Sequence, residues 1–346
     1  MDPIQVTVSR GDLVESVHLV DAVVVEREGA ILASAGDARR VTYWRSSAKP
    51  FQALPTVRKA AQASRPLQDA EISVMCGSHA GEPAHVEQVA ALLARFGLDE
   101  SHLRCGAHPP LHDPSAKALW QAGEEPRRIH CNCSGKHAGM LVHAQLIGAD
   151  LATYLEQHHP VQQAILETVS LFSGVPQQEI VLSIDGCGAP VFGLPLHAMG
   201  RAYANLVAPG DEVDAATQQA AATVVSSMQQ KPFFVAGTGR ICTRLMEVLA
   251  PRVVAKGGAE GVYCAGLPEK GWGIALKVHD GAGRATGPAI IEILAALGLI
   301  GEEAAQNLEE HRRPVVTNHA GVTVGQIEAR LAPGFEARLR HLAQSS

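Results

Sequence analysis

The N-terminal part of the chain shows the apolar pattern of β-strands. Residues 17–25 are rich in β-branched side chains, and a second apolar run occupies residues 30–33 after the turn at Glu28-Gly29. Two such runs around a glycine predict a strand, a turn and a second strand. The chain is therefore expected to open with a hairpin.

The middle of the chain shows helical spacing instead. Residues 49–62 carry apolar side chains at mixed helical intervals, and Pro50 fits the first turn of a helix. Ser46 and Lys49 should then lie near a helix start. Further helices are predicted over residues 84–96, 136–147, 161–172 and 211–230.

The C-terminal part returns to strands. Residues 253–258 and 271–278 are strand-like, and an apolar helix is predicted over residues 288–299. This order favours an α+β fold in which N- and C-terminal strands share an antiparallel sheet, with a helical lobe inserted at approximately residues 49–250. Because no low-complexity linker marks a boundary, residues 1–346 are predicted to form a single domain.

Composition and charge narrow the class of protein. Of the 346 residues, 46% are hydrophobic and 18% are charged, which excludes a disordered or fibrous chain. The net charge is −6 and Lys and Arg do not interleave with aromatic residues, so we expect small polar ligands and no nucleic acid. The N-terminus lacks the pattern of a signal peptide, and no apolar run approaches transmembrane length, so no membrane partner is expected.

The seven cysteines, an odd number, suit a reducing compartment and predict a cytoplasmic protein. Cys131 and Cys133 lie in the densest cluster of reactive side chains, residues 130–137 (HCNCSGKH). They are too close in sequence for an easy disulfide, whereas thiolates, amines and imidazoles are potential metal ligands or proton carriers. We expect Cys131 to point into packing. Four other cysteines have apolar neighbours and should be buried: Cys76, Cys105, Cys242 and Cys264.

Two lysine motifs point to serine chemistry. Ser46 and Lys49 form the only Ser-x-x-Lys of the chain, a spacing that puts hydroxyl and amine on one face of a helix. A lysine acts as a base only when neutral, which burial or a neighbouring cation favours. Lys256 begins a Lys-Gly-Gly after a β-branched strand, and the two motifs are paired in penicillin-binding proteins and β-lactamases. Ser78, between them, could supply a third hydroxyl.

Bland alternatives exist for each of these motifs. Ser46 could be a helix cap followed by an exposed lysine, and the segment around Ser78 could be a tight turn. Asp185 and Cys187 lie in a glycine-rich loop after an apolar strand, where loops tend to line ligands. Cys187 could be a nucleophile or an inert buried thiol, and we favour a ligand role beside Cys133.

Taken together, the motifs resemble those of the Rhizobium etli-type L-asparaginases, the asparaginase II family. The resemblance spans nearly the whole chain. The segments that carry it are residues 45–50 (RSSAKP), 77–83 (GSHAGEP), 130–137 (HCNCSGKH), 185–188 (DGCG), 237–240 (GTGR) and 256–261 (KGGAEG). It implies a fold similar to serine β-lactamases and penicillin-binding proteins, a homodimer, and hydrolysis of L-asparagine to L-aspartate and ammonia.

The resemblance also implies roles for individual residues. Ser46 with Lys49 matches one Ser-Lys pair of the family, and Ser78 with Lys256 matches the second. The family's zinc ligands match Cys133, Lys136 and Cys187. Such a site would have three protein ligands, one of them an amine, and water as the fourth ligand. Because the amine must lose its proton to bind, we expect zinc occupancy to be tunable.

From these roles follows a hypothesis for the reaction. Ser46 would attack the carboxamide carbon while neutral Lys49 takes its proton, and water would then hydrolyse the acyl-enzyme. Arg45 is the candidate for the substrate carboxylate, Asp185 for its ammonium group and His137 for a further hydrogen bond. The alternatives are a β-lactamase-like peptidase or D-amino-acid hydrolase, and a non-catalytic protein that binds zinc or an amino acid.

Overall fold

The computed structural model describes residues 1–344 and divides into two compact units. Unit 1 comprises Met1–Ser47, Leu194–Ala208 and the described chain from Arg244 onward, and unit 2 comprises Ala48–Gly193 and Pro209–Thr243. Each unit is described by itself. The single domain proposed for residues 1–346 stays a prediction.

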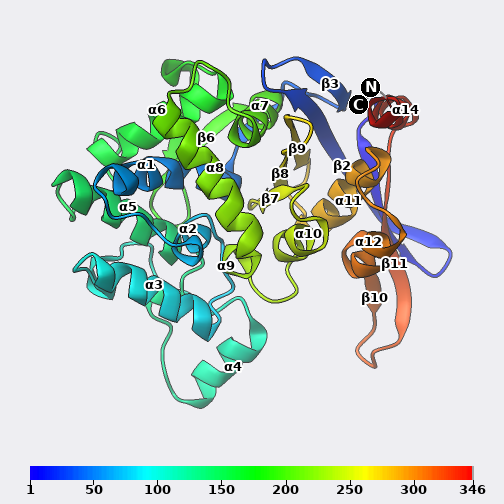
Figure 1. Ribbon diagram of the computed structural model, residues 1–346. Helices are drawn as coiled ribbons and strands as arrows, with labels where there is room; N and C mark the ends of the chain where they lie inside the picture. The colour runs from blue at the N-terminus through cyan, green and yellow to red at the C-terminus, as the bar shows by residue number, and fades with distance from the viewer. Residues whose placement is uncertain (345–346) are drawn as a thin grey trace. The chain divides into compact units, whose positions relative to one another are not determined.

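Unit 1 is built on an antiparallel sheet. Among the described residues, eight strands form it in the order β10-β11-β1-β2-β9-β8-β7, with β3 paired to β2. The strands are β1 (Ile4–Arg10), β2 (Leu13–Glu26), β3 (Ile31–Ala35), β7 (Val254–Gly257), β8 (Val262–Leu267), β9 (Trp272–Val278), β10 (Val315–Thr317) and β11 (Thr323–Arg330). Figure 1 shows the long blue strand β2 within the same sheet as the yellow strands β7 to β9. The predicted sheet of N- and C-terminal strands is therefore confirmed.

Unit 1 also contains helices, several of which pack against its sheet. They are α7 (Leu196–Val207), α10 (Ile241–Leu249, whose first turn belongs to unit 2), α11 (Thr286–Ala296), α12 (Glu302–Asn307), α13 (Glu309–Arg312) and α14 (Pro333–Gln344). Every residue of β8 is buried. Since successive side chains of a strand point to opposite faces, both faces of β8 must be covered. The short strand β4 (Val41–Tyr43) and the 3-10 helix η1 (Arg45–Ala48) end the N-terminal part of the unit.

Unit 2 is mainly helical. Its helices are α1 (Lys49–Gln62), α2 (Asp69–Met75), α3 (Pro83–Arg95), α4 (Asp113–Gln121), α5 (Ser134–Ile147), α6 (Pro160–Ser173), α8 (Ala215–Gln230) and α9 (Pro232–Ala236). The hairpin of β5 (Val181–Ile184) and β6 (Pro190–Pro195), whose paired residues all lie in unit 2, completes it. Short 3-10 helices lie at η2 (Glu100–His102), η3 (Arg128–His130) and η4 (Gln177–Glu179).

Helix α5 is the centre of unit 2, and two glycines let α2 approach it. Residues 134–144 of α5 are all buried. A Cβ on Gly135 would lie 2.2 Å from the carbonyl oxygen of Val74, and one on Gly139 would lie 2.8 Å from the Met75 Cε atom. The end of α2 therefore lies directly on the start of α5. This contact brings together the loops that carry Ser78 and Cys133.

The predicted elements are found, with small shifts at their ends. Helix α1 has the predicted bounds, while α5 begins two residues earlier than expected. Helix α8 begins at Ala215 and not at residue 211, because the Asp214 side chain accepts hydrogen bonds from the backbone N–H groups of Ala216 and Thr217 at 3.0 and 3.1 Å. Ser46 and Lys49 lie at a helix start, as predicted.

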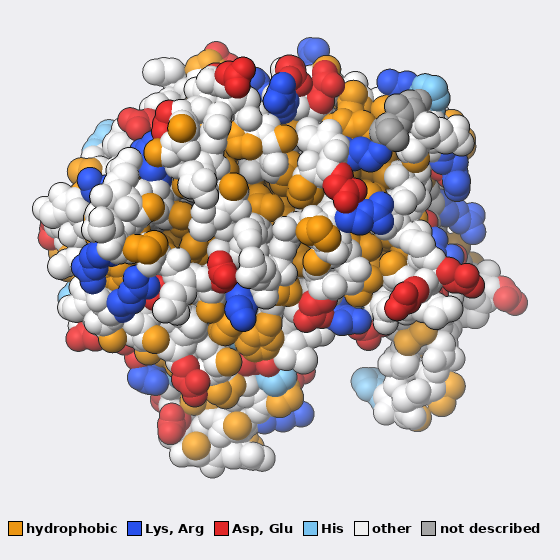
Figure 2. Space-filling model, in the orientation of Figure 1, with side chains coloured by type: hydrophobic (Ala, Val, Ile, Leu, Met, Phe, Trp, Pro, Cys, Tyr) orange, Lys and Arg blue, Asp and Glu red, His pale blue; other side chains and the backbone are white. Residues whose placement is uncertain are grey.

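The surface mixes charges of both signs. On the face drawn in Figure 2, blue Lys and Arg side chains alternate with red Asp and Glu side chains over white and orange areas. Within residues 1–344, no helix has both the length and the apolar character needed to cross a membrane.

The close packing of β9 against α7 in unit 1 gives a test of the fold. A Cβ on Gly273 would lie 1.8 Å from the carbonyl oxygen of Gly200 in α7. We therefore expect Gly273→Ala to lower the free energy of unfolding by about 3 kcal/mol or more, measured by urea denaturation. Gly283→Ala is the control, because a Cβ there meets no atom within 4 Å. Equal stability of the two variants would contradict the packing described.

Candidate active site

Lys49 lies deep inside unit 2. It is the first residue of α1 and is fully buried. Its Nζ atom donates hydrogen bonds to the Gly77 carbonyl oxygen at 2.6 Å and to Ser78 Oγ at 2.9 Å, and it lies 3.3 Å from Cys133 Sγ. Unit 2 therefore brings Lys49 and Ser78 into direct contact. The family resemblance implies a pair of Ser78 with Lys256, and the structure shows Ser78 in contact with Lys49.

Ser78 is held by the backbone around it. Its N–H donates to the Val235 carbonyl oxygen at 2.8 Å, and a Cβ on the preceding Gly77 would lie 2.6 Å from the Phe234 carbonyl oxygen. Glycine thus allows the segment after α8 to pass against the end of α2. Ser78 is half-buried, beside the buried lysine.

His79, which the sequence did not single out, fixes the loop after Ser78. Its Nδ1 accepts the Gly81 N–H at 3.2 Å, so Nε2 carries the proton and donates to Ser134 Oγ at 2.9 Å. The Ser134 hydroxyl in turn donates to the Ile129 carbonyl oxygen at 2.9 Å. Burial, and then the neighbouring His85 and Lys49, hold the pKa of His79 well below its usual range. A neutral imidazole therefore links the Ser78 loop to the start of α5.

The three predicted metal ligands come together in unit 2. Lys136 Nζ donates to Cys187 Sγ at 2.9 Å, and all three side chains are buried. Side-chain hydrogen bonds from Cys131 and Cys187 are the main cause that holds the pKa of the Cys133 thiol well below its usual range. The Lys49 and Lys136 amines lower that pKa further. The surroundings of Cys133 therefore favour its thiolate form.

The other two members of the set hold their protons more tightly. The hydrogen bond with Cys133, followed by burial, raises the pKa of Cys187. Burial lowers the pKa of Lys136, but the Cys187 and Cys133 sulfurs outweigh it, so the net shift is upward. Among the described residues no three His, Cys, Asp or Glu side chains form a metal site. The predicted set differs because its third donor is an amine, and two sulfurs with one nitrogen fit the donor preference of zinc.

The remaining predicted residues of unit 2 flank this set. Asp185 lies at the tip of the β5–β6 hairpin, where its Oδ1 accepts the Gly186 N–H at 2.9 Å. His137 is fully buried, and its Nδ1 lies 2.7 Å from the Tyr154 hydroxyl. Burial is the main cause that holds the pKa of His137 well below its usual range. Its Nε2 has no hydrogen-bond partner among the described residues.

Unit 1 carries the other three predicted residues. Lys256 is buried in β7, and its carbonyl oxygen accepts the Ser47 hydroxyl at 2.9 Å. Ser47 is fully buried, so of the two adjacent serines only Ser46 is partly exposed. Arg45 has a left-handed backbone, with φ of 52°, and its Nη1 lies 4.0 Å from the Glu260 carboxylate. The Ser-x-x-Lys spacing predicts Ser46, and Ser46 is also the more exposed of the two adjacent serines.

The boundary between the units falls between Ser47 and Ala48. Ser46 and Lys49 are three residues apart, yet they belong to different units. Ser78 and Lys256 are likewise divided between the units. Of the six remaining site residues, all except Arg45 lie in unit 2.

The four cysteines expected to be buried are buried: Cys76, Cys105, Cys242 and Cys264. Cys131 is buried as well, and its Sγ lies 3.6 Å from the Cys105 carbonyl oxygen.

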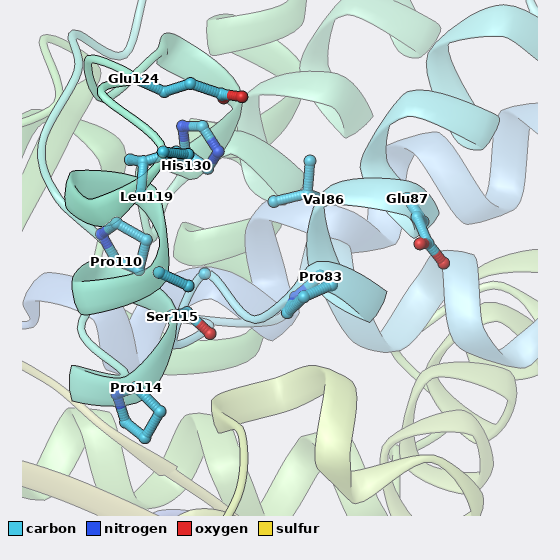
Figure 3. A pocket seen from close by; sticks show the side chains of 12 residues that line it. Pro83, Val86, Glu87, Pro110, Pro114, Ser115, Leu119, Glu124 and His130 are labelled. Carbon is cyan, nitrogen blue, oxygen red and sulfur yellow. The ribbon is translucent and has the colours of Figure 1, made fainter.

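A largely apolar cavity of about 510 Å³ opens beside the motif segments of unit 2. Figure 3 shows Pro83 and Val86 of α3 on one side of it, Pro110 and Leu119 on the other, and His130 above. Gly81 also lines it, but none of the ten predicted site residues does. The cavity therefore lies behind the Ser78 loop and is not the predicted catalytic centre.

The buried, neutral state of His79 predicts acid sensitivity. Unfolding exposes His79 and restores a pKa of about 6.5, so below that pH the unfolded chain binds more protons and stability falls. We expect His79→Gln to reduce the slope of unfolding free energy against pH, between about pH 6.5 and 5, by up to about 1.4 kcal/mol per pH unit. Urea denaturation across that range measures the slope. The exposed His158, changed to Gln, is the control, and equal slopes in both variants would refute the role of His79.

Comparisons with solved structures give distant similarities. A β-lactamase from Mycobacterium bovis is 16% identical, with 76% of this chain and 87% of that chain covered and a TM-score of 0.40. A D-alanine carboxypeptidase from Burkholderia cenocepacia is 10% identical, with 75% and 87% covered and a TM-score of 0.35. A penicillin-binding protein homologue from Pyrococcus abyssi is 11% identical, with 81% and 73% covered and a TM-score of 0.32. Similarities this distant carry no inference about activity.

No curated protein sequence matches the chain. A sequence model of one family, described as L-asparaginase II, matches residues 6–329. The match includes all ten predicted site residues and both units. The chain therefore belongs to the L-asparaginase II family of hydrolases.

Proposed function

We propose that the protein is an L-asparaginase, which hydrolyses the side-chain amide of L-asparagine to L-aspartate and ammonia by serine–lysine chemistry. The observation that carries the proposal is the Lys49 amine, fully buried and 2.9 Å from the Ser78 hydroxyl. A buried amine in contact with a hydroxyl is the arrangement that proton transfer from a serine requires. Membership of the L-asparaginase II family supports the substrate.

The reaction proceeds through an acyl-enzyme. Ser46 Oγ attacks the amide carbon while the Lys49 amine takes its proton, and backbone N–H groups stabilise the oxyanion. The tetrahedral intermediate collapses, the C–N bond breaks, and ammonia leaves with the proton. Water then attacks the ester and returns Ser46 and free aspartate. The contact of 2.9 Å with Ser78 gives the Lys49 proton a relay.

The same contact makes Ser78 the competing nucleophile. Ser78 Oγ lies within direct reach of Lys49 Nζ. If Ser78 attacks, the Lys49 amine takes its proton without a relay. The two versions share the base and the substrate, and they differ in which serine carries the acyl group.

The substrate zwitterion needs partners for both its charges. Asp185 is proposed for the ammonium group and Arg45 for the carboxylate. His137 is suited to a further hydrogen bond, because its buried Nε2 has no partner among the described residues and a buried polar atom without one is costly. These assignments and that of Lys256 as the second lysine stay predictions, as do the homodimer and the cytoplasmic location.

We further propose that Cys133, Lys136 and Cys187 hold zinc. When bound, the ion would lie beside the substrate site and supply positive charge there. The contribution of the chain is to keep two sulfurs and an amine together in a buried position. Since Lys136 and Cys187 must lose protons to bind, occupancy should fall as the pH falls.

The first test separates the two serines. We expect Ser46→Ala to abolish ammonia release from asparagine, at least 1000-fold in kcat, with the thermal unfolding curve unchanged. Ser47→Ala is the matched control, because the adjacent Ser47 hydroxyl is occupied by the Lys256 carbonyl oxygen. Mass spectrometry of quenched enzyme locates the acyl group. An acyl group on Ser78, with activity retained in Ser46→Ala, would transfer the role of nucleophile to Ser78.

The second test concerns the metal. We expect the wild type to retain about one zinc per chain after dialysis, and Cys133→Ala and Cys187→Ala to lose it, as measured by elemental analysis. Cys242→Ala, a change at another buried cysteine, should keep it. Retention of zinc by both ligand variants would refute the site. Activity should fall only in part, because the metal does not activate the attacking group.

A further inference from the structure

Glu82 makes a two-point contact across unit 2 that the proposed reaction does not yet use. Glu82 as a whole residue is 8% exposed. One oxygen accepts the Thr238 N–H at 2.8 Å, and the other accepts the Thr238 hydroxyl at 2.7 Å. Both carboxylate oxygens of Glu82 thus accept hydrogen bonds from a single residue of the loop 237–240, the GTGR segment.

The geometry of the preceding glycine shows that this contact is built into the backbone. Gly237 has φ of 115°, a conformation open to glycine and strained for other residues. A Cβ there would lie 2.6 Å from Glu82 Oε1 and 2.7 Å from the Ala80 Cβ atom. Only glycine allows Thr238 to present both its N–H and its hydroxyl to Glu82.

The position of Glu82 would also allow its side chain to cap helix α3. It is the N-cap residue of α3, and its carbonyl oxygen accepts the His85 N–H at 2.9 Å. Its side chain makes no capping hydrogen bond. Replacement of the side chain should therefore leave the cap of α3 intact, and the effect should fall on the contact with Thr238.

The contact closes the Ser78 loop at its second end. The first end is fixed by the hydrogen bond from the Ser78 N–H to the Val235 carbonyl oxygen at 2.8 Å. Four residues later Glu82 holds Thr238. Residues 78–82 are thus attached at both ends to residues 235–238. Ser78, at the first of these attachments, has its Oγ 2.9 Å from Lys49 Nζ.

We propose that Glu82 is a positioning residue that clamps the 237–240 loop onto the Ser78 loop and so holds the Ser78 hydroxyl beside Lys49. The expected effects on turnover rest on the proposed asparaginase function. Glu82 touches neither serine nor lysine, so it acts through Thr238 and the loop backbone. Burial raises the pKa of Glu82, but the two bonds from Thr238 lower it more, so the clamp is an anion at neutral pH.

Activity measurements test the clamp through paired variants. Glu82→Ala should lower kcat for ammonia release from asparagine by about 10- to 100-fold with little change in KM, because a small displacement of a reacting group costs rate more than binding. Glu82→Gln should restore most of kcat, since its amide oxygen can accept the Thr238 N–H and its amide nitrogen can donate to the Thr238 hydroxyl. Glu87→Ala, at an exposed glutamate of the same helix α3, is the control.

A second pair tests the partner of Glu82. Thr238→Val should lower kcat and Thr238→Ser should not, and adding Thr238→Val to Glu82→Ala should cost less than the two single losses combined. Full additivity would show that the residues act separately and would overturn the clamp. So would a kcat of Glu82→Ala equal to that of the wild type.

Hydrogen exchange tests the clamp without any substrate. In Glu82→Ala the amides of Thr238 and Ser78 should exchange faster, and in Glu82→Gln they should stay protected. Unchanged exchange at Ser78 in Glu82→Ala would overturn the positioning role. If the wild type releases no ammonia from asparagine, the proposed function fails, and exchange at Ser78 still decides the clamp.

Discussion

The Lys49 amine is the group on which the arrangement of unit 2 depends. An amine removed from water must find hydrogen-bond acceptors, because a buried polar group without partners costs several kcal/mol. Lys49 finds them in the Gly77 carbonyl oxygen and Ser78 Oγ, after α2, and in Cys133 Sγ, before α5. The loops at the end of α2 and the start of α5 must therefore meet at one point.

Glycines at the helix contact make that meeting possible. Gly135 and Gly139 lie one turn apart on α5, and side chains there would strike α2. A larger residue at Gly135 would push α2 away and move the Ser78 loop from Lys49. The geometry of the reactive groups thus depends on glycines, which have no side chain to keep the two helices apart. Cys133 then joins Lys49 to the candidate metal ligands, so the two halves of the predicted site share one buried network.

The sequence predicted helices and strands well where the apolar residues followed one clear spacing, helical or alternating. Long helices such as α1, α3 and α6 were found within a residue or two, and so was the central strand β9. Strands β1, β10 and β11 were missed, although Ile4, Val6 and Val8 alternate with polar residues in β1 and pack inward. Helix α7 was missed because its residues follow the apolar strand β6 directly, and a continuous apolar run gives no clear period.

The candidate site was predicted by residue but not by contact. Motifs named Lys49 and Ser78, yet their direct contact depends on how α1 and α2 pack, which no local pattern encodes. His79 and Glu82 stood inside a quoted motif, but their partners Ser134 and Thr238 lie more than fifty residues away in the chain. A short motif shows which side chains are present. It does not show which residues, distant in the sequence, will contact them in the folded chain.

The Lys-Gly-Gly motif shows how one short segment can serve two purposes. Lys256 brings an amine into a buried strand, whereas Gly258 serves packing, because a Cβ there would lie 3.1 Å from both Ser47 Oγ and the Trp44 carbonyl oxygen. The Ser47 hydroxyl also donates to the Lys256 carbonyl oxygen. The strand that carries the second lysine is therefore packed against the turn that carries Ser46. In unit 1, as in unit 2, glycines allow backbone segments to approach closely, and this approach fixes the positions of the reactive residues.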